Sequence, residues 1–115
     1  LALGMTAAVC DKDTVIAASG PCRKELMDKP IHSDLEELMD RRGRLCVGAD
    51  GGTAPHITAD EAQPFAAAAI ATIICAGDPI GAVMLLSRDE NASIGRAEQK
   101  ATETAANFLG KQMEG

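Results

Sequence analysis

The stretch FAAAAIATIICAGDPIGAVMLLS, residues 65–87, holds the two longest apolar runs of the chain. The first run begins with the helix-favouring Ala66–Ala69 and then becomes rich in β-branched residues at Ile70–Ile74, which restrict χ1 and favour a pleated sheet. The second run, Ile80–Leu86, is short and apolar on both faces. Between them, Gly77 precedes Asp78-Pro79, a pair that favours turn initiation. We therefore expect a β-hairpin of two central strands, covered on both sides.

The composition is that of one small domain with an aliphatic core. The 115 residues fit a single domain, residues 1–115, because domains of about 100–150 residues are the commonest. Hydrophobic residues make up 46% of the chain and aromatic residues only 2%, with no Trp or Tyr. An RNA-binding surface that stacks bases, or an aromatic cage, needs flat rings that this chain lacks.

The net charge of −6 argues against direct contact with nucleic acid, since the phosphate backbone repels an acidic protein. No secretory signal or membrane-spanning segment is visible, because the apolar Leu1–Leu3 is far too short for either. We expect a cytoplasmic protein that does not enter a membrane. The chain lacks an initiator Met, which suggests a segment of a longer protein.

The four cysteines do not form a metal-binding or disulfide pattern. Cys10, Cys22, Cys46 and Cys75 include no C-x-x-C pair, and the two histidines lie far from any close cysteine pair. Zinc sites usually need such paired spacing, so we expect no metal and no cofactor. Cys10 and Cys75 lie inside apolar runs, where a cysteine behaves as a small buried hydrophobe in a reduced cytosol.

Before the central hairpin, the sequence predicts a second hairpin and two helices. Met5–Cys10 and Thr14–Ala18 are apolar runs joined by a short polar turn. Arg23–Asp28 follows Pro21 and predicts a short helix. A second helix is expected with Ser33 as its N-cap, because Ser33-Asp34-Leu35-Glu36 has the pattern of a capping box, and it ends before Gly43.

Between this helix and the central hairpin lie a short strand and a long loop. Arg44–Val47 is the strand candidate. The loop, Gly48–Gln63, has room for one short strand at His56–Thr58, and loops of this length are usually functional or mobile. At the other end of the chain, Leu1–Gly4 has the pattern of a frayed helix end with Gly4 just past it.

The C-terminal segment has two apolar stripes at helical spacing and predicts a helix that ends near Met113. The sequence leaves two arrangements open. Both stripes pack inside one chain, or one of them meets the same helix of a second copy through small Ala residues. The first stripe is Ile94, Ala97, Ala101, Ala105, Phe108 and Gln112, and the second is Thr102, Ala106, Leu109 and Met113.

The expected order is strand, strand, helix, helix, strand, strand, strand, helix. Both hairpins must lie in one sheet to share a core, which gives an α+β fold with a central antiparallel sheet of five or six strands flanked by helices. No G-x-G-x-x-G or other phosphate-binding loop opens a helix in this sequence, so a βαβ dinucleotide-binding fold is not expected.

Four segments carry a family resemblance. Ala76–Val83 resembles the central hairpin of small-molecule-sensing GAF domains. Together with Val9–Asp13, Ala17–Gly20 and Ala101–Glu114, it is similar to the C-terminal, GAF-like domain of the stage V sporulation protein T family, and the similarity runs through most of the chain. It is weakest between Gly48 and Phe65.

The resemblance implies a transcription regulator of endospore-forming bacteria. In that family a swapped-hairpin domain, absent from this chain, binds DNA. The GAF-like half is regulatory, dimerises through its terminal helices and helps to assemble a tetramer. We therefore expect a homodimer that responds to an unknown small-molecule effector and contacts DNA only through the N-terminal domain. The expected dimer interface is Ile94, Ala97, Ala101, Ala105, Phe108, Leu109 and Gln112.

By the same resemblance, a ligand would lie between one face of the sheet and the helices and loops that cover it. Arg23 could hold an anion, because its planar guanidinium suits a carboxylate or phosphate. Each candidate also has a purely structural explanation, for example that Thr72 is an ordinary β-former. The candidate ligand-binding residues are Ser19, Cys22, Arg23, Cys46 and Thr72.

Two further functions stay open beside ligand sensing. Some GAF domains reduce free methionine sulfoxide with cysteine thiols, which needs an exposed thiolate and a resolving partner. Cys22, beside Arg23 and Lys24, would be the nucleophile and Cys46 the resolving thiol. The other possibility is a dimerisation module without a ligand. We expect no enzyme activity and no catalytic residues, since His32 and His56 are not part of a recognisable catalytic triad.

Overall fold

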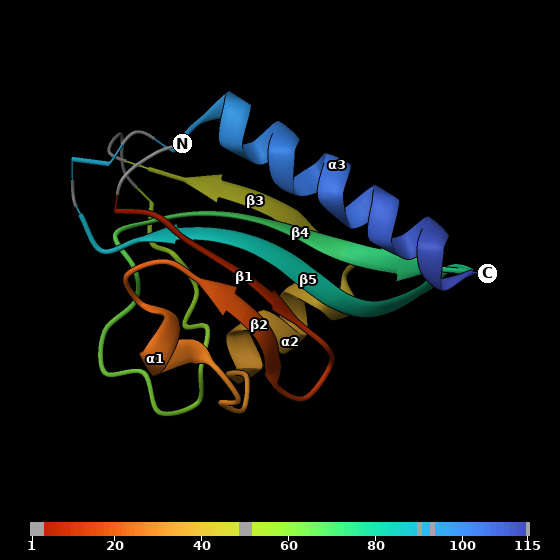
Figure 1. The fold of residues 1–115 in the computed structure, drawn as a ribbon, viewed down its shortest axis with the longest axis horizontal. Coiled ribbons are helices and arrows are strands. Elements are labelled where there is room, and N and C mark those ends of the chain that lie inside the picture. Colours follow the sequence, from red (N-terminus) through yellow and green to blue (C-terminus); the bar gives the residue numbers. More distant parts are fainter. Residues whose placement is uncertain (1–3, 49–51, 90, 93, 115) are drawn as a thin grey trace.

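The structure, a computed structural model, describes residues 4–48, 52–89, 91–92 and 94–114. Within them, five strands and three helices follow one another in the expected order. Figure 1 shows α3 along one side of the sheet and α1 and α2 on the other. The elements are β1 Thr6–Cys10, β2 Val15–Ser19, α1 Arg23–Leu26, α2 Ser33–Asp40, β3 Arg44–Val47, β4 Ala67–Cys75, β5 Asp78–Ser87 and α3 Arg96–Met113.

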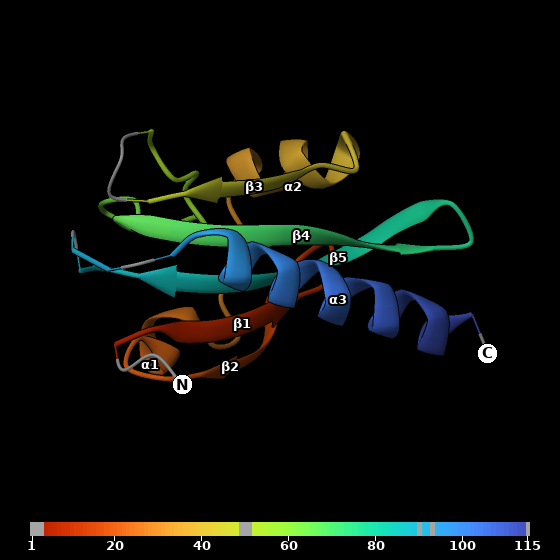
Figure 2. The same cartoon turned by 90° about the horizontal axis from the view of Figure 1, so that it is seen from above.

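The sheet confirms the expected α+β architecture. Its strand order is β2-β1-β5-β4-β3, and every neighbouring pair is antiparallel. In the central hairpin, β5 pairs with β1 and β4 pairs with β3. The hairpin therefore links the β1–β2 pair to β3. Seen from above, α3 runs along the sheet over β4 and β5 (Figure 2). The two strands predicted from residues 65–87 are therefore the centre of the domain.

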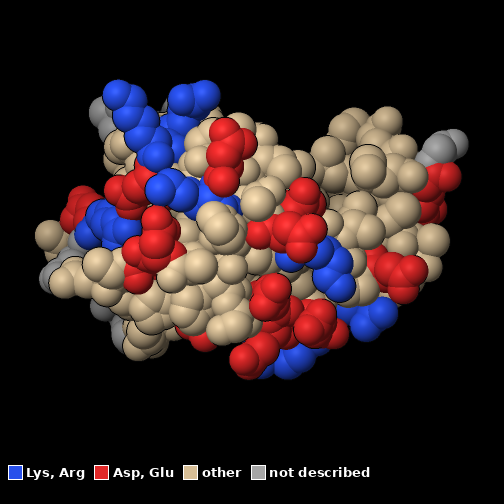
Figure 3. Space-filling view, turned by 90° about the horizontal axis from the view of Figure 1, so that it is seen from below, with Lys and Arg blue, Asp and Glu red and all other residues tan. Residues whose placement is uncertain are grey.

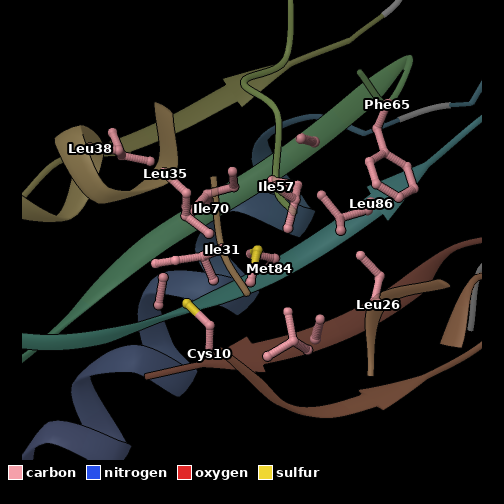
Figure 4. Packing of buried hydrophobic residues seen from close by; sticks show 14 of the residues in the cluster. Cys10, Leu26, Ile31, Leu35, Leu38, Ile57, Phe65, Ile70, Met84 and Leu86 are labelled. Atoms are coloured by element: carbon pink, nitrogen blue, oxygen red, sulfur yellow. The ribbon is translucent and has the colours of Figure 1, made fainter. Parts of the chain in front are cut away.

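The main core lies between the sheet and the layer of α1, α2 and the loops. Ile70 and Met84 from the sheet meet Leu35 of α2 and Ile57 of the long loop there (Figure 4). All four side chains are fully buried. Because burying an aliphatic side chain of this size stabilises by roughly 1.5–3 kcal/mol, this aliphatic cluster holds the two layers together without a large aromatic content.

The opposite face of the sheet is covered mainly by α3. Ala71 and Ile73 of β4 pack against Ala106 of α3, and Ala67 and Ala69 pack against Ile94 just before that helix. Small residues on β4 let the helix lie close to the sheet. This arrangement explains why the Ala66–Ala69 segment, which has good helix formers, is extended from Ala67 onward: both faces of β4 are covered, and tertiary burial overrides helix propensity.

The turn of the central hairpin differs from the sequence prediction. Asp78 and Pro79 belong to β5, where Asp78 pairs with Cys75 and Pro79 with Ile74. The two-residue loop is Ala76-Gly77, with φ of 51° and 86°. Positive φ at both central residues matches the right-handed twist of the strands in such tight hairpins, so the pair next to Asp78-Pro79 makes the turn.

The N-cap of α2 also differs from the sequence prediction, which was Ser33. His32 is the N-cap, and its Nδ1 accepts a hydrogen bond of 3.0 Å from the backbone N–H of Asp34. Ser33 is the first residue of the helix, so the Ser33–Glu36 capping box does not form. An imidazole acceptor two residues before the N–H replaces the usual hydroxyl or carboxylate cap.

Three smaller expectations are adjusted. Helix α1 ends at Leu26 rather than Asp28, whose φ of 64° is incompatible with a helix. In the long loop, Thr58 forms only an isolated bridge with Ile31. The helix end expected at Leu1–Gly4 falls mostly outside the described residues.

Among the residues described, no helix combines the length and hydropathy needed to cross a bilayer.

The face that carries α1 and α2 mixes acidic and basic side chains (Figure 3). Acidic groups lie over much of this face, and most of the basic groups gather toward one end of it.

Candidate functional site

The two stripes of α3 differ in how far they are buried. Thr102, Ala106 and Gly110 are buried against the sheet, and Leu109 is half-buried with them. Gly110 lies so close to β4 that an added Cβ would clash with the carbonyl oxygen of Ile74. The helix thus docks on its own sheet by the second stripe as far as Gly110, whereas Met113, the last residue of that stripe, is 67% exposed.

The first stripe points mostly to solvent. Ala97, Ala101 and Gln112 are exposed, and Phe108 is 62% exposed although it is one of two aromatic residues in the chain. Ala105 is half-buried at the edge of the stripe. We call these five residues the α3 stripe. The described part of one chain does not bury it.

Two residues of the expected interface pack inside the chain. Ile94 is only 6% exposed and belongs to the cluster under β4. Leu109 packs beside Ala71 and Ile73. Both belong to the domain's own core, and the surface open to a partner consists of the α3 stripe.

An apolar groove runs alongside the α3 stripe, between the helix and the outer face of β1, β2 and β5. Its volume is about 370 Å³, and a second hollow continues it toward the start of α3, past Ala97 and Glu98. We call the first hollow the α3 groove. Its lining is Ala7, Ala8, Val9, Ala17, Ala18, Ser19, Val83, Met84, Leu85, Ala101, Thr102 and Ala105.

Of the strand residues that line the α3 groove, only Ser19 was named from the sequence. Ala7 and Val9 pair with Ser19 and Ala17 across the β1–β2 hairpin, and all four point to the α3 side. The alternation of buried and exposed residues along β1 carries this information. The sequence alone did not show that a helix would stop short of covering this part of the sheet.

Three of the five candidate ligand-binding residues lie at the β2 edge of the sheet. Ser19 ends β2 and lines the α3 groove. Cys22 precedes α1, and its backbone N–H donates to Oγ1 of the buried Thr6 over 2.9 Å. Arg23 is the exposed first residue of α1. Of the three, Ser19 is the one that the groove includes.

The other two candidates lie on the far side of the sheet. Cys46 is on β3, with Sγ 3.6 Å from the carbonyl oxygen of Gly95. Thr72 on β4 donates its hydroxyl to the carbonyl of Gly43 over 2.6 Å. Since β2 and β3 are the two edges of the sheet, Cys46 and Thr72 do not share a pocket with Cys22 and Arg23. The five residues do not form one site, and a role for each stays a prediction.

The thiols are separated in the same way. Cys22 packs at the margin of the core under α1 and α2, whereas Cys46 packs under the segment that precedes α3. These clusters lie on opposite faces of the sheet. A nucleophile and its resolving thiol must meet, and this pair does not in the folded chain. Cys10 is fully buried, and burial raises the pKa of its thiol to about 12, which makes it unreactive.

Comparison with known proteins agrees with this architecture. The family model described as stage V sporulation protein T C-terminal, transcription factor, matches residues 1–114. The chain belongs to this family. It is also 37% identical over 112 residues to stage V sporulation protein T of Bacillus subtilis (strain 168), and the match covers 97% of the chain. It spans 61% of the length of that relative, so the relative has further sequence with no counterpart here.

Proposed function

We propose that this chain is the regulatory, self-associating domain of a sporulation transcription regulator, and that a second copy covers the α3 stripe. The observation that carries the proposal is the 62% exposure of Phe108, which follows three alanines in the α3 stripe, beside an apolar groove. Exposed apolar patches next to a groove commonly mark interaction sites. Family membership supplies the setting, a transcription factor family of sporulation.

The geometry suits a symmetric pair. In a two-fold dimer the same patch is used by both copies, so Phe108 of each can enter the groove or cross the stripe of the other. Ala97, Ala101 and Ala105 have small side chains, which allow close approach of two helices, because interaxial distances of about 8–10 Å depend on the residues at the contact. A buried aromatic ring contributes roughly 150–250 Å² to such an interface.

The experiment is a concentration series by analytical ultracentrifugation on the wild-type chain and two variants. Phe108→Glu places a charge in the middle of the stripe and should shift the chain to monomer. Asn107→Glu adds the same charge at the neighbouring residue, which is exposed but outside the stripe, and should leave the monomer–dimer equilibrium as in the wild type. A wild-type chain that stays monomeric up to millimolar concentration would contradict the proposal, as would a dimer unaffected by Phe108→Glu.

Sensing of a small-molecule effector, as in GAF-like domains, is a second candidate. The α3 groove favours it, because ligand pockets are typically about 300–1,000 Å³ and mainly apolar, and its volume of about 370 Å³ lies in that range. Ser19 would supply a polar contact at its end. A thermal-shift screen of small molecules tests this, since any bound effector raises Tm by mass action. Ala17→Leu, which fills the groove, should abolish a shift that Ile16→Leu leaves intact.

Contact with DNA would then fall to another domain of the regulator. The acidic balance of this chain and the mixed charges of the α1–α2 face support that division of labour. A gel-shift assay with the isolated chain should show no binding to promoter DNA at physiological salt.

A further inference from the structure

Two segments that are far apart in the sequence meet at the start of α2. His32 caps this helix, and Asp34 lies in its first turn. His56 comes from the long loop before β4. The loop is fixed there by backbone pairing, because the N–H of His32 donates to the carbonyl of Ile57 over 2.8 Å and Thr58 bridges to Ile31. This pairing brings the only two histidines of the sequence side by side.

The side chains form a compact cluster around the Asp34 carboxylate. Nδ1 of His56 lies 3.2 Å from Oδ2, and Nδ1 of His32 lies 3.6 Å from Oδ1. The two imidazole rings are stacked, with centroids 4.8 Å apart and planes inclined by 27°. One potential ligand atom from each residue lies within 4.8 Å of the other two. We call this group the His–Asp–His cluster.

These separations are those of a metal-binding set. Imidazole nitrogen and carboxylate oxygen bind zinc at about 2.0–2.2 Å, so two ligands of one tetrahedral ion are roughly 3.3–3.5 Å apart. The two N–O distances of the cluster, one to each oxygen of the Asp34 carboxylate, are 3.6 and 3.2 Å and so lie close to this value. The remaining adjustment is a closer approach of the two rings, which rotation about side-chain torsions can supply.

The cluster is open enough to receive an ion. The side chains of His32, Asp34 and His56 are 30%, 42% and 35% exposed, so one side of the cluster faces water. Water could therefore enter as a further ligand. Nδ1 of His32 accepts the backbone N–H of Asp34 in the metal-free chain, and an ion bound at this nitrogen would replace that hydrogen bond.

A purely structural role accounts for part of the geometry. Oδ2 of Asp34 accepts the backbone N–H of His56 over 3.2 Å and so ties the loop to α2. One carboxylate oxygen would suffice for that tie. It does not require a second histidine stacked on the first.

We infer that His32, Asp34 and His56 bind one divalent transition-metal ion of the Zn²⁺ class. Two imidazoles and one carboxylate suit Zn²⁺, Co²⁺, Ni²⁺ or Cu²⁺, whereas Mg²⁺ and Ca²⁺ prefer oxygen ligands throughout. A bound ion fixes the long loop to the first turn of α2 and stabilises the layer that contains Ile57 and Leu35. The site is separate from the α3 stripe, which lies on the other face of the sheet.

The test uses the untagged chain, because a polyhistidine tag would bind the same ions. Zinc chloride is titrated while the imidazole C–H signals are followed by NMR. Since the chain has two histidines, both signal sets should shift together and saturate at one Zn²⁺ per chain, with a rise in Tm. Magnesium chloride should change neither. If only one histidine shifts, or if neither does, the proposal is overturned.

Variants separate this site from the thiols. His32→Asn keeps a good N-cap and removes one ligand, and His56→Gln removes the other. Each should weaken Zn²⁺ binding by at least about tenfold. Asp34→Asn should have the same effect, although its amide oxygen can still accept the backbone N–H of His56. Cys22→Ser is the control and should bind like the wild type. Binding that survives both histidine variants, or that disappears in Cys22→Ser, would assign the ion to cysteine and contradict the inference.

Discussion

Gly110 of α3 lies directly against the carbonyl of Ile74 on β4, backbone to backbone, with no room for a Cβ between them. This contact is in the last turn of the helix, which ends at Met113. It fixes both the distance of α3 from the sheet and its rotation about its own axis. The exposure of the α3 stripe on the opposite side follows from it.

Replacing Gly110 with Ala tests that contact. In an exposed helix position the same change stabilises by roughly 0.5–1 kcal/mol, because Ala restricts the unfolded chain more than Gly. Here the methyl group must push the helix away from Ile74, so we expect a loss of about 1–3 kcal/mol in the free energy of unfolding. Urea denaturation measures the change. Asn107→Ala, at an exposed position of the same helix outside the α3 stripe, is the control and should be near neutral; a more stable Gly110→Ala chain would contradict the close contact.

The two-residue turn of the central hairpin makes a second prediction. Ala76 has φ of 51°, a conformation that is costly for Ala and easy for Gly or Asn. Ala76→Gly should therefore stabilise the chain by about 0.4–1 kcal/mol, and Gly77→Ala should destabilise it by at least as much. Thermal and urea unfolding of the two variants give the comparison. Equal effects of the same sign would mean that the turn has a different conformation.

Burial of Cys10 predicts a specific pattern of thiol labelling. Its pKa is raised to about 12 and its side chain is fully buried, so iodoacetamide should leave Cys10 unmodified in the native chain at pH 8. Cys22 and Cys75 are partly exposed and should react. Peptide mass spectrometry measures the labelling. Addition of urea is the control, because all thiols then become reactive; labelling of native Cys10 as fast as Cys22 would show that β1 opens readily.

The turn between β1 and β2 predicts a dependence of stability on pH. The N–H groups of Thr14 and Asp13 donate to Asp11 over 2.8 and 2.7 Å and hold the pKa of its carboxyl below the usual 3.8. A carboxyl with a lowered folded-state pKa stabilises the fold above its unfolded pKa, and this contribution is lost as the pH falls through the folded pKa.

Asp11→Asn should therefore be less stable than the wild type at pH 7, and the difference should shrink toward pH 3. Chemical denaturation at several pH values between these limits gives the free energies. Asp13→Asn, in the same turn, is the matched control. If the difference in the free energy of unfolding stayed constant over the whole pH range, it would come from the geometry of the Asn side-chain amide and not from loss of the carboxylate charge.

Local chemistry was enough to predict most of the elements. Branched residues in Ile70–Ile74 and the continuous apolar runs on both sides of Gly77 indicated the central hairpin, because a strand buried on both faces has no polar alternation. The 3.6-residue spacing in the C-terminal segment predicted α3 with its correct end at Met113. The sequence was less informative about caps and turns, where neighbouring residues such as His32 and Ser33 compete for one position.

The sequence by itself determined that this chain is a small α+β domain with an aliphatic sheet at its centre, because the spacing of apolar residues along the chain indicates which faces of each element are buried. Only the tertiary structure decided which stripe of α3 meets the sheet. Both stripes have helical spacing, and the packing of Gly110 against Ile74 determines which one faces β4. It alone brought His56 to His32 and put Cys22 and Cys46 on opposite faces. These relationships depend on how distant segments pack together, and residue spacing along the chain does not specify that.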